Sequence, residues 1–161
     1  MAGIQPTDLG KDQANPAPFG AKTVSDDWET QILETVRGEA AWQALLEANP
    51  DIEPPVAGME YLIAHVRLRY ISSREGRASI YSDNFFSTGS KGEENWVPNV
   101  RLNQTPNRNW ISSYFYPGLE VDGWTVLQVA IGETGTVIIF KPDLHAYGMP
   151  ENNVRYLLVQ P

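Results

Sequence analysis

The sequence GMEYLIAHVRLRYI, residues 58–71, decides the fold because its polarity alternates along its length. From residue 61 onward, every second residue is apolar: Leu62, Ala64, Val66, Leu68 and Tyr70. The residues between them begin apolar and become basic: Tyr61, Ile63, His65, Arg67 and Arg69. Successive side chains of a strand point to opposite faces of the sheet. The stretch therefore predicts a long strand with one face in the core and the other half covered, then solvated.

Composition indicates one folded, acidic domain. The chain has 161 residues and a mass of 18.0 kDa, and 42% of its residues are hydrophobic, which is enough for a core without covalent cross-links. The formal net charge is -8 and the pI is about 4.7. An acidic surface argues against nucleic acid or an anionic membrane as the main partner.

The sequence contains no cysteine and only two histidines. This excludes disulfides, thiolate zinc sites and cysteine nucleophiles, and it argues against a multi-histidine metal site. No apolar run approaches the ~20 residues that span a bilayer. The first 20 residues have no apolar core of a signal peptide, which fits either a cytoplasmic protein or the mature form of an exported one.

Local patterns predict where the other elements lie. Residues 1–18 are polar and rich in proline and glycine, so we expect a flexible tether before a domain over 19–161. Residues 39–49 predict the only helix, with Trp42, Leu45 and Leu46 as its apolar stripe. Further strands are predicted over 22–24, 28–36, 78–82, 84–88, 95–102, 110–116, 119–129, 136–141 and 154–159. Pro98 demotes the strand over 95–102 to a sheet edge.

Short strands at a spacing of roughly 8–12 residues, with turn residues between them, favour an antiparallel sandwich or barrel. The order of motifs narrows this choice. Gly58, Glu60 and Tyr61 follow the helix and a proline-rich turn. Later come Pro117-Gly118, Gly123-Trp124 and Lys141-Pro142, each beside a β-prone stretch.

This order, over residues 16–159, resembles an uncharacterised family of exported bacterial immunoglobulin-like domains, of the lipoprotein type and with a sandwich like that of an immunoprotective antigen. The resemblance implies an all-β, immunoglobulin-like antiparallel β-sandwich with one short inserted helix. It also implies a location outside the cell or at its surface, and no catalytic residues. This sequence has neither the signal peptide nor the lipid-attachment cysteine of such proteins.

No stretch carries a catalytic or metal-binding pattern. The carboxylate pairs Asp26-Asp27, Glu93-Glu94 and Glu120 with Asp122 stand in polar, turn-like surroundings, where a solvated role is expected. Asp26-Asp27 and the segment 143–153 do not match a spaced calcium loop. His65 and His145 have no G-x-S-x-G serine to activate, so we expect no enzyme, cofactor or metal.

Aromatic residues crowd into residues 95–116, with asparagines between them. Such residues suit protein or sugar recognition, or they build the core. The candidate binding residues are Trp96, Trp110, Tyr114 and Tyr116, with the two tryptophans as anchors. The first hypothesis is a non-enzymatic, extracellular or cell-surface protein-interaction module, or a subunit of an envelope assembly. The alternative is a carbohydrate-binding module that uses the same four aromatics. The partner is then a surface protein or a glycan, with membrane contact only through a removed lipid anchor.

Overall fold

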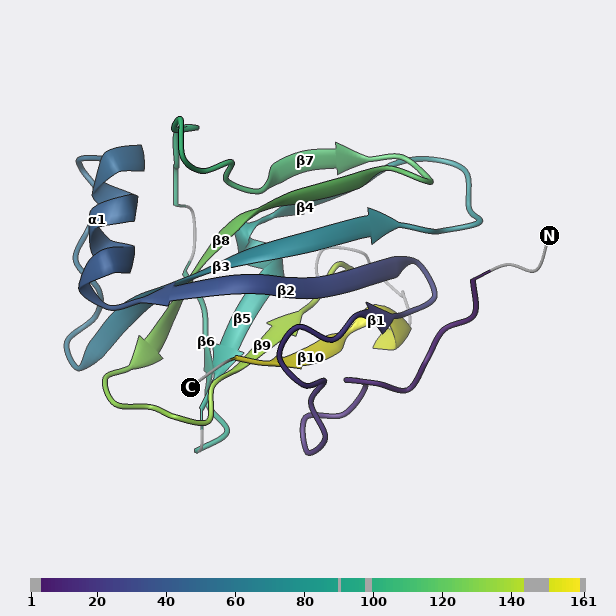
Figure 1. Cartoon of the computed structure of the whole chain (residues 1–161), viewed down its shortest axis with the longest axis horizontal. Coiled ribbons are helices and arrows are strands. Elements are labelled where there is room, and N and C mark those ends of the chain that lie inside the picture. The colour runs from purple at the N-terminus through teal and green to yellow at the C-terminus, as the bar shows by residue number, and fades with distance from the viewer. Residues whose placement is uncertain (1–3, 90, 98–99, 144–150, 160–161) are drawn as a thin grey trace.

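The computed structural model describes residues 4–89, 91–97, 100–143 and 151–159, and these residues contain ten β-strands and one α-helix, α1 (Glu39–Ala48) (Figure 1). Two short 3₁₀ helices, η1 (Ser82–Asn84) and η2 (Glu151–Asn153), complete the elements. The strands are β1 (Thr23–Val24), β2 (Trp28–Arg37), β3 (Met59–Tyr70), β4 (Ala78–Tyr81), β5 (Phe85–Thr88), β6 (Glu94–Asn95), β7 (Ser112–Phe115), β8 (Glu120–Ala130), β9 (Val137–Phe140) and β10 (Arg155–Leu158).

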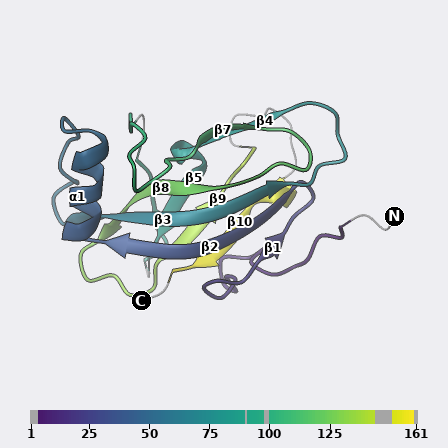
Figure 2. The same ribbon diagram turned by 45° about the horizontal axis from the view of Figure 1, so that its top comes forward.

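The strands form a sandwich of antiparallel sheets. One sheet has the order β1-β2-β3-β8, and the facing sheet has the order β10-β9-β5-β6. A separate ribbon of β4 and β7 lies along the edge next to β8, as both views show (Figures 1 and 2). All strand pairs in the described part of the chain are antiparallel. The predicted all-β sandwich with one short inserted helix is confirmed.

The long central strand β3 has the two faces that its sequence predicts. It pairs with β2 on one side and β8 on the other. Its inner residues Leu62, Ala64, Val66, Leu68 and Tyr70 are buried between the sheets. Trp28 of the neighbouring strand β2 packs edge-on against Phe140 of the facing sheet and Phe115 of the β4–β7 ribbon. One departure occurs in β2, where the register shifts between Ile32 and Glu34 and ends the predicted alternation.

A second core covers the outer face of β3 at one end. Here α1 packs over Tyr61, Ile63 and Val126 of β3 and β8, together with Val97, Val100, Leu102 and Trp110. The residues of α1 that are buried are Ala41, Ala44, Leu45 and Ala48. Trp42 is only half buried and stacks on Tyr61 with ring centroids 5.9 Å apart. The predicted stripe is therefore correct at Leu45 but rotated toward small alanines, which let the helix approach the sheet closely.

Residues 95–102 differ most from their predicted strand, since among the described residues of this stretch only Asn95 is paired, in the short strand Glu94–Asn95. The chain beyond it turns toward α1, where the Asn49 amide donates to the Arg101 carbonyl and the Asn103 N–H donates to the Ala48 carbonyl. Pro98 itself lies outside the described residues.

No helix in the described part of the chain has the length and apolar character that a membrane span requires.

The segment predicted as a tether packs against the domain in its described part. Ala17 is buried, and it exchanges backbone hydrogen bonds with Tyr156 and Leu158 of β10. Gly10 accepts a bond from the Tyr156 N–H, and a Cβ at Gly10 would lie 2.7 Å from the Tyr156 carbonyl oxygen. Its φ of 72° is also one that side chains disfavour. The backbone of these polar residues is thus ordered by pairing, which composition does not reveal.

Candidate binding surface

Three exposed tyrosines gather on the β4–β7 ribbon. Tyr81, Tyr114 and Tyr116 are 39%, 50% and 56% exposed, and we call these three residues the tyrosine face. Tyr81 and Tyr114 lie on the outer side of the ribbon, because Ile80 and Phe115, which alternate with them, point into the core. The Arg77 guanidinium lies 4.2 Å from the centre of the Tyr114 ring. A hydrogen bond with Tyr114 raises the pKa of Tyr81. Tyr81 and Tyr114 are therefore neighbours on two paired strands, and Tyr116 directly follows β7.

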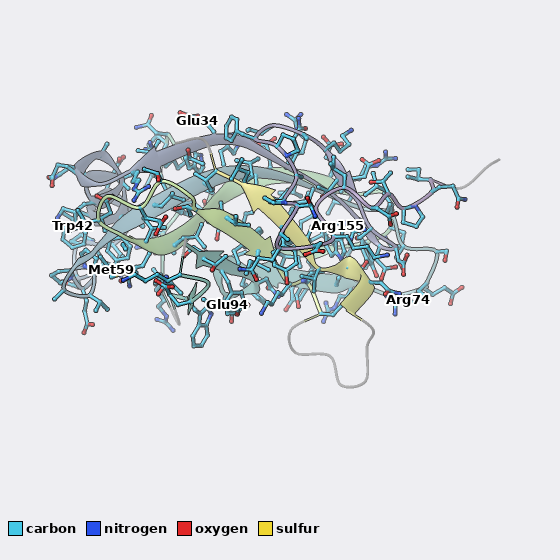
Figure 3. All side chains as sticks on the ribbon, turned by 90° about the horizontal axis from the view of Figure 1, so that it is seen from below. Glu34, Trp42, Met59, Arg74, Glu94 and Arg155 are labelled. Carbon is cyan, nitrogen blue, oxygen red and sulfur yellow. The ribbon has the colours of Figure 1, made fainter. Side chains whose placement is uncertain are left out.

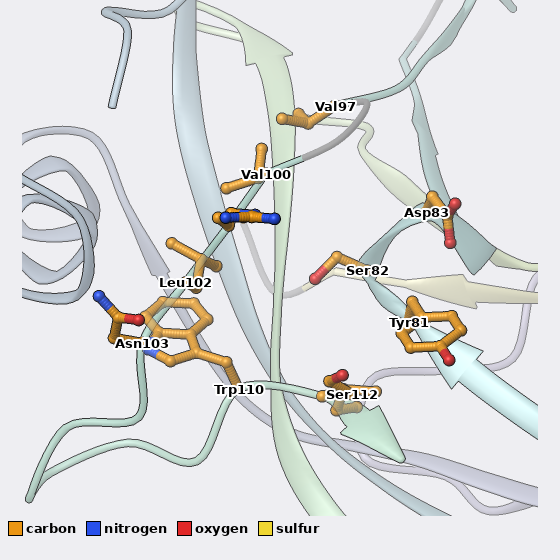
Figure 4. Close-up of a pocket in the computed structure, with 11 residues that line it drawn as sticks. Tyr81, Ser82, Asp83, Val97, Val100, Leu102, Asn103, Trp110 and Ser112 are labelled. Carbon is orange, nitrogen blue, oxygen red and sulfur yellow. The ribbon is translucent and has the colours of Figure 1, made fainter. Parts of the chain in front are cut away.

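A cleft of about 490 Å³ opens beside the tyrosine face (Figure 4). One wall is the turn from β4 into η1, with Tyr81, Ser82 and Asp83. The other wall is the crossing segment with Val97, Val100, Arg101, Leu102 and Asn103, closed by Trp110, Ile111 and Ser112 at the start of β7. Two segments that are distant in sequence thus form one concave site.

Trp110, predicted as an exposed anchor, is 2% exposed and belongs to the second core. Its backbone pairs in parallel with that of Trp124 of β8 as an isolated β-bridge, in which the Ile111 N–H donates to the Trp124 carbonyl at 2.9 Å. Gly123 permits this crossing, because a Cβ there would lie 2.8 Å from Cγ1 of Ile111. The prediction of an exposed Trp110 is corrected, since the chain lays this residue over β8 before β7 begins.

Trp96 is 45% exposed, as an anchor requires, but it lies on the other sheet. Its ring stacks on Phe86 of β5 with centroids 6.2 Å apart. The Lys141 ammonium lies over the Phe86 ring, 4.6 Å from its centre, and also forms an ion pair with Glu94. Trp96 therefore has contacts that are separate from those of Tyr114.

The outer face of β3 and β8 carries the described histidine. His65 stacks on Trp124 with centroids 5.0 Å apart, and its Nε2 lies 2.8 Å from Asp122 Oδ1. Arg108 approaches the same indole, at 4.8 Å from its centre. These contacts hold His65 as part of the packing of the sheet surface. His145 lies outside the described residues.

The two acidic stretches that sequence analysis considered for calcium meet in space. Asn153 Nδ2 donates to Asp27 and to Asp143 at 2.8 Å each, and Asn152 Nδ2 donates to Asp26 at 3.1 Å. Arg74 forms a short ion pair with Asp27. Amide and guanidinium donors occupy these carboxylates, and no metal-like group of three carboxylate, histidine or cysteine side chains occurs among the described residues. This network joins the ends of the chain, and the sequence alone shows no sign of the convergence.

Comparisons with known proteins identify similar folds. No family model and no curated protein matches the sequence. The structure is similar to a putative lipoprotein, YcdA, of Bacillus subtilis, with a TM-score of 0.60 and 12% identity over 86% of this chain and 38% of that one. The chain thus spans well under half of that protein. It is also similar to the YjhA protein of Bacillus subtilis, with a TM-score of 0.55 and 12% identity over 89% and 98% of the two chains. A β-sandwich protein of Clostridium difficile has a TM-score of 0.46 at 9% identity.

Proposed function

We propose that this protein is a non-enzymatic binding module that acts at the cell surface or outside the cell, and that the tyrosine face contacts a protein partner. The observation that carries the proposal is the tyrosine face itself. Tyrosines give a large, rigid contact area and lose little side-chain entropy on binding, so a few of them can dominate an interface. The paired strands β4 and β7 hold Tyr81 and Tyr114 in place before the partner arrives, which lowers the cost of association.

The location rests on the fold. The similarity to a Bacillus subtilis protein described as a putative lipoprotein supports the resemblance to exported lipoprotein-type domains. A subunit of an envelope assembly would present such a face to its neighbours. The carbohydrate alternative, in which four aromatics form one platform, receives no support from the packing, because Trp110 is buried and Trp96 lies on the other sheet.

The proposal is tested by photo-crosslinking in the native host with the full-length gene product. A photoreactive phenylalanine analogue replaces Tyr114 or Tyr116, and the control position is Ile131, which is 66% exposed in the turn after β8. We expect discrete crosslinked proteins from the two tyrosine positions and none from Ile131. Protease treatment of intact cells should degrade the protein if it is outside. An identical pattern from all three positions, or no crosslink at Tyr114 and Tyr116, would contradict the proposal.

Binding measurements then establish whether the tyrosines supply affinity. Tyr114→Ala should weaken binding of the crosslinked protein by more than about 1 kcal/mol, as for a hot spot. Because the side chain is half exposed, the thermal unfolding midpoint should stay near that of the wild type. Ile131→Ala serves as the matched control and should bind normally.

A further inference from the structure

We propose that the cleft beside the tyrosine face binds a neutral mono- or disaccharide. This site shares Tyr81 with the tyrosine face, but neither proposal depends on the other, because Tyr114 and Tyr116 do not line the cleft. The cleft volume of about 490 Å³ falls within the ~300–1,000 Å³ that small-molecule sites commonly have. A concave site of this size holds one or two sugar rings and is too small for a folded protein partner.

The lining of the cleft has the amphipathic character of a sugar. Its apolar part consists of Val97, Val100, Leu102, Trp110 and Ile111. Its uncharged polar part consists of Tyr81, Ser82, Asn103 and Ser112, on both sides of the opening (Figure 4). A sugar ring has C–H groups that pack on apolar and aromatic surfaces, and its hydroxyls both donate and accept hydrogen bonds. Serine, tyrosine and asparagine side chains also do both, so they match hydroxyl groups without a charge.

The charges of the cleft argue against other ligand classes. Asp83 and Arg101 are of opposite sign, so the lining carries no net charge. A phosphate ligand would call for several cationic groups or a pair of bidentate arginines. A purely apolar ligand would remove water from the polar rim without replacing its hydrogen bonds, which is costly. A neutral polyhydroxylated ligand avoids both problems.

A buried hydrogen-bond donor adds an independent indication. The indole Nε1–H of Trp110 is buried and has no hydrogen-bond acceptor among the described residues. Buried donors are seldom left without an acceptor in folded proteins. The indole lines the cleft together with Asn103, whose side chain is at the surface. A ligand hydroxyl that lies between the indole and the Asn103 amide would supply the missing acceptor and would keep Asn103 as a second partner.

The test begins with an array of immobilised neutral oligosaccharides, followed by calorimetric titration of the best binder into the whole chain. Asn103→Ala removes a polar group from the rim, and Ser112→Trp fills the opening with a large ring. Both positions are exposed, so the variants should unfold near the wild-type temperature. Ile131→Ala is the matched control, because Ile131 is exposed in the turn after β8 and does not line the cleft.

We expect the wild type and Ile131→Ala to bind the sugar equally. Asn103→Ala should weaken binding tenfold or more, and Ser112→Trp should abolish it. The proposal is overturned if no neutral glycan binds the wild type, or if both cleft variants bind as tightly as the control. If Ser112→Trp unfolds at a lower temperature, the Asn103→Ala titration decides the outcome.

Discussion

Replacement of Arg155 by methionine tests how the chain termini are held together. Arg155 lies on β10 with 2% of its surface exposed (Figure 3). Its Nη1 donates to the carbonyl oxygens of Asn152 and Val154, both at 2.8 Å. Its Nη2 donates to those of Thr7 at 3.0 Å and Val24 at 2.9 Å. One guanidinium thus connects the N-terminal segment, β1 and β10.

The electrostatics of Arg155 follow from its burial. Burial lowers the pKa of Arg155, while the nearby carboxylates Asp26 and Asp8 act in the opposite direction. Four carbonyl dipoles, instead of a carboxylate in contact, solvate the charge. Methionine fills much of the space of the side-chain stem but supplies no donor. The carbonyl oxygens then lose their charged hydrogen bonds.

The magnitude follows from what each carbonyl retains. The Val24 carbonyl oxygen still accepts a hydrogen bond from the Thr7 N–H at 2.9 Å, so it keeps one donor in the variant. Each remaining carbonyl that is buried without a donor costs about 1–3 kcal/mol, and some of them will reach water at the surface. We therefore expect Arg155→Met to lower the free energy of unfolding by about 3–5 kcal/mol, which is typical of breaking a buried charged network.

Urea denaturation followed by tryptophan fluorescence measures this loss. With a slope of ~1–3 kcal/mol per molar urea, the midpoint should fall by roughly 2 M. The matched control is Arg67→Met on the outer face of β3, where Arg67 pairs with Glu120 at 3.3 Å and the two side chains are 43% and 52% exposed. Such a pair contributes at most about 1 kcal/mol. Equal midpoints for the two variants would refute the reasoning, because the carbonyls would then have found other donors.

Two further predictions concern α1 and the buried acid Asp27. Trp42→Ala should lower the free energy of unfolding by about 2 kcal/mol, because Trp42 is half buried against Tyr61. Leu45→Ala should lower it by about 3 kcal/mol, because Leu45 is fully buried. Urea midpoints in the opposite order would contradict this packing of the helix. Burial acts to raise the pKa of Asp27, but bonds from Ser72, Asn153 and Arg74 outweigh it and lower the pKa below the usual value. The carboxylate therefore stabilises the fold above the pKa of the unfolded chain, and this stabilisation is lost as the pH falls through the lowered pKa. Asp27→Asn should be less stable than the wild type at pH 6, with the difference shrinking in acid; a difference that does not change with pH would exclude this linkage.

Local periodicity was sufficient for the elements whose environment repeats along the chain. The alternation in β3 identified its buried face, and the apolar start of the opposite face correctly indicated partial cover. The proline after Asn49 placed the end of α1 within one residue. These features follow from backbone geometry, because a strand has a period of two and a helix a period of 3.6 residues. Such periods are visible in sequence without knowledge of any partner.

Periodicity does not predict which of the candidate binding residues are exposed and which are buried. Tyr114 and Tyr116 are exposed as binding residues must be, yet Trp110 from the same aromatic stretch is buried. No local pattern distinguishes them, because the burial of Trp110 depends on the crossing of residues 109–111 over β8. The cleft could not be predicted from the sequence either, because its walls come from stretches separated by more than a dozen residues.

By itself, the sequence determined the sandwich class, the inserted helix, the inner face of β3 and the acidic, cysteine-free character of the chain. Only the tertiary structure decided that Gly10 and Ala17 pair with β10 and that Asp27 contacts Asn153, 126 residues later in the sequence. It also decided that Trp96 lies apart from the tyrosine face. The physical reason is the range of the interactions. Hydrophobic alternation acts between near neighbours in sequence, whereas backbone pairing and buried polar contacts join groups that only the folded chain brings within hydrogen-bond distance.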